Sequence, residues 1–161
     1  MLLTIMACCR LPGICTRYTS DITITQTMNF GWFMPSSTLA GTIQITNTGT
    51  VVPSAGITVV SSHQPIPEIF TLHRSASGNV TVYIISSSSP PTLTLNGPSS
   101  STMTVDNWDL SIATGSNPNR YTVNYAWTSD KVVTLGATLH VKANQTPGTY
   151  TGNFTIYTVP N

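Results

Sequence analysis

The chain has 161 residues, a net charge of +1, and only 7% charged residues against about 25% in a typical globular domain. So few charges exclude the basic surface that nucleic-acid-binding proteins carry. Hydrophobic residues make up 40% of the chain, which excludes an intrinsically disordered protein.

Residues 1–20 differ from the rest of the chain because they hold all three cysteines, Cys8, Cys9 and Cys15. The apolar run at residues 2–9 resembles the hydrophobic region of a signal peptide but lacks the basic segment before it. Three interpretations stay open: the end of a secretion signal, a strand given to a neighbouring subunit, or a start-site artefact. No segment approaches the ~18 apolar residues of a transmembrane helix.

Residues 21–161 show apolar side chains at every second position, which is the period of half-buried strands. The 28 threonines favour strands because their side chains are β-branched. We predict one all-β domain, a β-sandwich, without an internal boundary. The predicted strands are residues 22–28, 42–46, 57–60, 69–73, 80–84, 93–95, 103–105, 110–112, 121–127, 132–141 and 150–159.

The residues that could carry chemistry are few and dispersed. His63, His73 and His140 show no metal-binding spacing, and we expect all three on the surface. The part of the chain after residue 20 has no cysteine for a disulfide or a metal. We therefore predict no catalytic residue, no metal site and no cofactor.

The acidic residues offer two weak alternatives. Asp106 and Asp109, with Asn107 between them, have the oxygen ligands of a calcium site, but a loop-capping role is favoured. Glu68 is the only glutamate, and its proline-flanked position predicts a solvated loop residue rather than a general base.

Two aromatic clusters are present, and either could stack on sugars. Packing in the core or between subunits is the favoured interpretation. The clusters are Phe30, Trp32 and Phe33, and Tyr121, Tyr125 and Trp127.

Three patches together carry a resemblance to a known family. They are NFG at residues 29–31, FTL at 70–72 followed by GNVTV at 78–82, and LGATLHV at 135–141 running into ANQTPGTYTG at 143–152. Their order and spacing resemble a bacterial pilin-like family that is catalogued as a domain of unknown function (family 4402). The chain is also similar, more distantly, to spore-coat-U-type subunits of chaperone–usher pili. The resemblance covers about residues 21–159.

The resemblance implies an incomplete immunoglobulin-like β-sandwich whose last strand is missing and is donated by a neighbour's N-terminal extension. Residues 1–20 would be that extension and residues 21–161 the pilin-like domain. The implied donor residues are Leu3, Ile5, Ala7 and Cys9. Because Pro12 and Gly13 interrupt the extension, Ile22 and Ile24 are an alternative donor pair. The strand lining the groove would present Tyr150, Gly152, Phe154 and Ile156.

The function that the resemblance implies is structural. The chain would be a subunit of an extracellular bacterial fibre on the cell surface, exported through the periplasm. Its partners would be copies of itself, with a periplasmic chaperone and an outer-membrane usher as candidate assembly partners. The alternative is a monomeric cell-surface module that binds a glycan or an adhesion ligand, and an enzyme is the least favoured class.

Overall fold

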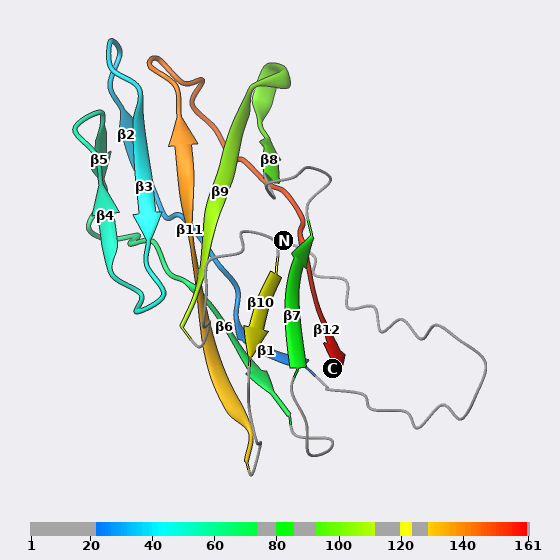
Figure 1. The fold of residues 1–161 in the computed structure, drawn as a ribbon. Coiled ribbons are helices and arrows are strands. Elements are labelled where there is room, and N and C mark those ends of the chain that lie inside the picture. The colour runs from blue at the N-terminus through cyan, green and yellow to red at the C-terminus, as the bar shows by residue number, and fades with distance from the viewer. Residues whose placement is uncertain (1–21, 74–79, 86–92, 112–119, 124–128, 161) are drawn as a thin grey trace.

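The computed structural model describes residues 22–73, 80–85, 93–111, 120–123 and 129–160. These residues form twelve strands and one short 3-10 turn, Pro98–Ser100, with no α-helix among them. The prediction of an all-β fold is therefore confirmed, and the packed, curled sheets are consistent with a β-sandwich (Figure 1).

The larger sheet is organised around one long strand, β11, drawn in orange in Figure 1. One edge of β11 pairs first with β6 and then with β3, while its other edge pairs with β9. The sheet continues from β6 to β1, from β3 to β4, and from β9 to β8. Its strands are β1 (Ile22–Gln26), β3 (Gly41–Ile45), β4 (Val51–Pro53), β6 (Glu68–Leu72), β8 (Leu93–Asn96), β9 (Thr102–Leu110) and β11 (Lys131–Val141).

Two smaller sheets complete the described fold. One has the order β10-β7-β12, and the other pairs β2 with β5. The strands of these sheets are β2 (Phe33–Pro35), β5 (Ile57–Val59), β7 (Val80–Ile85), β10 (Arg120–Val123) and β12 (Thr155–Pro160). Side chains from the smaller sheets, among them Val82 and Ile156, join the larger sheet's Phe70 and Leu72 in one buried cluster.

The structure differs from the predicted strands at several places. The strands β2 and β4 were not predicted, because each has only three residues and ends in a proline. Residues 103–105 and 110–112 were predicted as separate strands, but β9 runs continuously from Thr102 to Leu110. Asn107 has φ of +49° where the pairing with β11 shifts register, so the apparent turn is a β-bulge.

The last predicted strand is shorter than expected. The pattern placed it at residues 150–159, whereas β12 begins at Thr155. Before that point only Thr151 pairs, in an isolated bridge with Asn96. The residues predicted at 112 and 124–127 lie outside the described residues.

Candidate functional site

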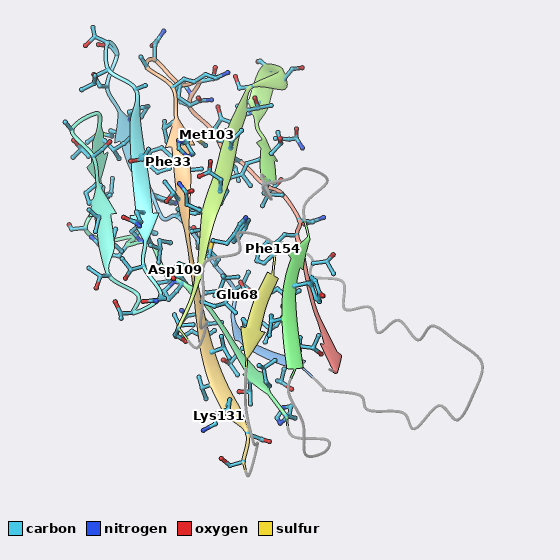
Figure 2. All side chains as sticks on the ribbon, in the orientation of Figure 1. Phe33, Glu68, Met103, Asp109, Lys131 and Phe154 are labelled. Carbon is cyan, nitrogen blue, oxygen red and sulfur yellow. The ribbon has the colours of Figure 1, made fainter. Side chains whose placement is uncertain are left out.

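The most prominent hollow among the described residues is an apolar groove with a volume of about 870 Å³. One wall is formed by residues 27–35, and the other by residues 145–152 together with Phe154. Strands β8, β9 and β11 form its floor. Figure 2 labels one residue from each part: Phe33 in the first wall, Met103 in the floor and Phe154 in the second wall.

The floor of the groove belongs to the hydrophobic core. Its residues are Leu93, Leu95, Met103, Val105, Trp108 and Leu139. All of these except the partly buried Leu95 are buried members of the core cluster. Phe154 also packs directly on the floor, with its ring centroid 4.8 Å from that of Trp108. The groove therefore opens into the core rather than onto a polar surface.

The first wall carries a strand edge that no described strand covers. On its outer side, Trp32 N donates to His63 O, Val60 N donates to Trp32 O, and Ser36 N donates to Gly56 O. Successive residues of an antiparallel strand direct their backbone groups to alternate edges. The N–H and C=O of Phe33 therefore lie on the opposite edge of β2, and β2 pairs with only β5 among the described strands.

The second wall has the same property. Thr151 exchanges both backbone bonds with Asn96, at 2.8 and 3.0 Å. By the same alternation, the backbone groups of Tyr150 and Gly152 point away from β8. Further along, β12 pairs with β7 and with no other described strand. Backbone groups without described partners, in β2 on one side and beside the Thr151 bridge on the other, thus flank an apolar floor.

The first wall is anchored at its start by a buried carboxylate. Glu68 is 1% exposed, and its Oε2 accepts a 2.6 Å hydrogen bond from Met28 N. Burial raises the pKa of this carboxyl, and the bond from Met28 opposes that rise. The prediction that Glu68 is a solvated loop residue is wrong, because Glu68 begins β6 and pairs with Leu135 of β11.

The second wall is held by a network around Tyr150. The Tyr150 hydroxyl donates to Thr146 O at 2.6 Å and accepts from Gln145 Nε2 at 2.7 Å. The ring of Tyr150 lies against Gly97, where an added Cβ would come within 2.3 Å of it. Gly148 has φ of +150°, a backbone conformation that favours glycine over residues with a side chain.

The structure brings most of the predicted groove-strand residues to this site. Tyr150, Gly152 and Phe154 line the groove, and Ile156 is fully buried in β12. The rest of the second wall was not predicted because residues 145–149 show no alternation, and the structure has no strand there.

The predicted donor residues fall into two groups. Ile22 and Ile24 lie in β1, opposite Leu72 and Phe70 of the chain's own β6. In this structure they complete their own sheet, so they are not free to enter a neighbour. Leu3, Ile5, Ala7 and Cys9 lie outside the described residues.

The first aromatic cluster divides between the groove and the surface. Phe30 and Phe33 are partly buried against the core. Trp32 is 62% exposed, and its ring stacks on His63 with 3.7 Å between centroids and 4° between planes. The side chains of Tyr121, Tyr125 and Trp127 lie outside the described residues.

The remaining histidines make hydrogen-bonded pairs at the surface. His73 Nδ1 lies 2.7 Å from an oxygen of Asp130, and His73 Nε2 lies 2.8 Å from Thr23 Oγ1. His140 Nε2 lies 2.7 Å from Asp106 Oδ1.

Asp106 and Asp109 lie in β9 rather than in a loop, and they face different partners. Asp109 accepts bonds from Asn47 N and Asn47 Nδ2 at 3.3 and 3.2 Å, so it caps the turn between β3 and β4. Within the described ranges, no three His, Cys, Asp or Glu side chains gather closely enough to hold a metal ion. No helix in those same ranges has the length and apolar character needed to span a membrane.

A family model described as "Domain of unknown function (DUF4402)" matches residues 21–159. No curated protein and no solved structure matches the chain. Because the family model covers most of the sequence, the chain belongs to the DUF4402 family.

Proposed function

We propose that this DUF4402 protein is a structural subunit of an extracellular bacterial fibre that polymerises by donor-strand complementation. In each junction, residues 1–20 of one copy would enter the groove of the next copy. The observation that carries the proposal is the groove itself, whose floor is core and whose two walls carry backbone groups without described partners.

An added strand fits the chemistry of both walls. Its backbone would pair with the free groups of Phe33 on one side and of Tyr150 and Gly152 on the other. Alternate side chains of a strand point to one face, so Leu3, Ile5, Ala7 and Cys9 would all face the floor. That floor is apolar, as these side chains require.

The burial of such side chains gives the junction its strength. A fully buried Leu or Ile side chain contributes about 1.5–3 kcal/mol, and the new backbone pairing excludes water from both walls. We therefore expect fibres that resist denaturant strongly. An unfilled groove that reaches the core invites aggregation, so a periplasmic chaperone and an outer-membrane usher are the proposed assembly partners, by likeness to spore-coat-U-type subunits.

The test compares the full chain with a variant that lacks residues 1–20. We expect the full chain to form guanidinium-resistant filaments and the shortened chain to remain a subunit that a synthetic peptide of residues 1–12 stabilises. Stabilisation should follow peptide concentration, by about 2.7 kcal/mol at a hundredfold excess over Kd. The control peptide carries Leu3→Asp and Ile5→Asp, which places charges on the floor.

Two results would contradict the proposal. Filaments that form equally well without residues 1–20 would remove the donor role of that segment. A thermal midpoint that shifts equally with the control peptide would show that the apolar face does not enter the groove.

A glycan-binding module is the second candidate, and the exposure of Trp32 favours it. An exposed indole held in place by a stacked imidazole is a surface on which a sugar ring can stack. If this function is correct, Trp32→Ala abolishes retention on polysaccharide columns while self-association is unchanged. Retention equal to that of the unmodified chain would exclude a role for this indole.

A further inference from the structure

The groove lining includes one buried glutamine, and the oxygen of its amide has no described partner. Gln145 lines the groove and is only 8% exposed. Its Nε2 donates to Tyr150 Oη at 2.7 Å and to Thr102 O at 3.3 Å. Its Oε1 is buried and has no hydrogen-bond partner among the described residues.

The neighbours of Gln145 define which end of the amide is the oxygen. Thr102 O is a carbonyl and can only accept, so it requires the NH₂ group. The Tyr150 hydroxyl already donates its proton to Thr146 O and therefore also requires a donor. Reversing the amide would direct its oxygen at two acceptors, so Oε1 is the atom that remains without a donor.

Buried polar groups in folded proteins are almost always hydrogen-bonded, because leaving one unpaired is costly. The exception here lies at the wall of the groove that the proposed donor strand fills. Tyr150 and Thr102 orient the amide so that Oε1 is left as an unused acceptor. Such an acceptor is typical of a binding site rather than of a closed core.

We propose that Gln145 fixes the register of the incoming strand by accepting a hydrogen bond, at Oε1, from a side-chain N–H, O–H or S–H group in residues 1–20 of a second copy. This inference rests on the proposed function. An apolar floor alone does not specify register, since a strand displaced by two residues again presents apolar side chains. A single buried polar group does specify it, because wrong registers leave the acceptor unpaired.

The matched variants are Gln145→Met and Gln44→Met in the full chain, which make the same change of side chain at two positions. Only Gln145→Met removes an oxygen at the groove, because Gln44 is exposed on β3 and does not line the groove. We expect Gln145→Met to weaken self-association about tenfold, the effect of one buried hydrogen bond. Gln44→Met should stay within about twofold of the unmodified chain. Depolymerisation of filaments over a guanidinium series, followed by light scattering, measures both.

A second measurement uses the unmodified chain and therefore does not depend on whether a variant folds. With ¹³C-labelled glutamine, the Gln145 Cδ resonance should move when monomers assemble, because its oxygen gains a donor. The resonance of Gln44, which is exposed on β3, serves as the reference.

The outcomes separate the two proposals. If full chains do not self-associate, the fibre function fails and the register role fails with it. If they do self-associate, but Gln145→Met assembles like the unmodified chain or the Cδ resonance does not move, water satisfies Oε1 and only the register role is overturned.

Discussion

Strand β11 and the segment of residues 145–160 differ in how many of their backbone edges are paired. On one edge β11 meets β6 and then β3, and on the other it meets β9. The strand pairings of the segment with other described residues are those of Thr151 with Asn96 and of β12 with β7. Both contribute buried side chains to the same core.

This difference suggests that β11 mainly stabilises the subunit, whereas residues 145–160 mainly serve its assembly with other copies. From Leu135 to His140, β11 has strand partners on both edges within the subunit, so this stretch has little left to offer a partner. The segment of residues 145–160 borders a groove that reaches the core, and its other edge is where the proposed donor strand would pair. Changes in β11 should therefore alter folding, whereas changes along the segment should alter assembly.

The largest expected effect is at Gly136, in the middle of β11. An added Cβ would lie 2.1 Å from Ile45 O, at the point where β3 follows β6 along the edge of β11. Because the obstructing atoms are backbone, they cannot rotate away. We expect Gly136→Ala to lower the free energy of unfolding by about 3 kcal/mol or more, measured by urea denaturation.

The control is Val132→Ala in the same strand, at a side chain that is exposed. Its effect should stay within about 0.5 kcal/mol. Equal stability of Gly136→Ala and the unmodified chain would show that the pairing of β3 with β11 is loose, and the contrast with the groove segment would lose its basis.

The fold was largely predictable, since alternation identifies a strand wherever one face is buried. Phe70 and Leu72 in β6, and the buried apolar residues of β11, follow this rule. The strand predictions were wrong where something other than alternation determines the local structure. Asn107 suggested a turn because asparagine tolerates positive φ. The pairing of Asp106 and Asp109 with β11 nevertheless keeps β9 continuous through it. The three-residue strands β2 and β4 have too few residues to show any period.

The site was less predictable, because a groove is formed by segments far apart in the chain. Alternation identified Gly152 and Phe154 but gave no reason to pair them with residues 27–35. Gln145 precedes a Pro-Gly turn and carries no sequence signal of burial. The burial of Glu68 was missed because the preceding Pro67 suggested a loop, whereas the buried carboxylate is explained by its hydrogen bond from Met28 N, a tertiary contact.

The next largest effect is expected at Glu68, whose backbone pairs with β11 and whose carboxylate binds Met28 N in the first wall of the groove. Glu68→Ala leaves Met28 N without its acceptor, whereas Glu68→Gln keeps an oxygen for it. We expect Glu68→Ala to be less stable than Glu68→Gln by about 1–3 kcal/mol in urea denaturation. If the two variants are equally stable, the bond to Met28 does not anchor the groove wall.

The same residue predicts a pH dependence. Burial raises the pKa of the Glu68 carboxyl above its ordinary value of 4.5, so the folded state holds its proton more tightly than the unfolded state. This contribution to stability is complete below pH 4.5 and is lost as the pH rises through the folded-state pKa. Relative to Glu68→Gln, the unmodified chain should lose stability as the pH rises above 4.5, and a constant difference would contradict the raised pKa.

The smallest effect is expected at the hydrogen-bonded pair of His140 and Asp106, which joins β11 to β9 beside the bulge. The side chains are 42% and 29% exposed, so water and salt screen their attraction. We expect Asp106→Ala to cost about 0.5 kcal/mol, and the His140→Ala, Asp106→Ala double-mutant cycle should give a coupling of similar size. A coupling several times larger would mean that surface electrostatics, rather than the buried contact of Val105 with Leu139, holds β9 to β11. The pairing of β9 with β11 would then weaken as salt is added, and β11 would no longer be the stable part of the fold with which the groove segment is compared.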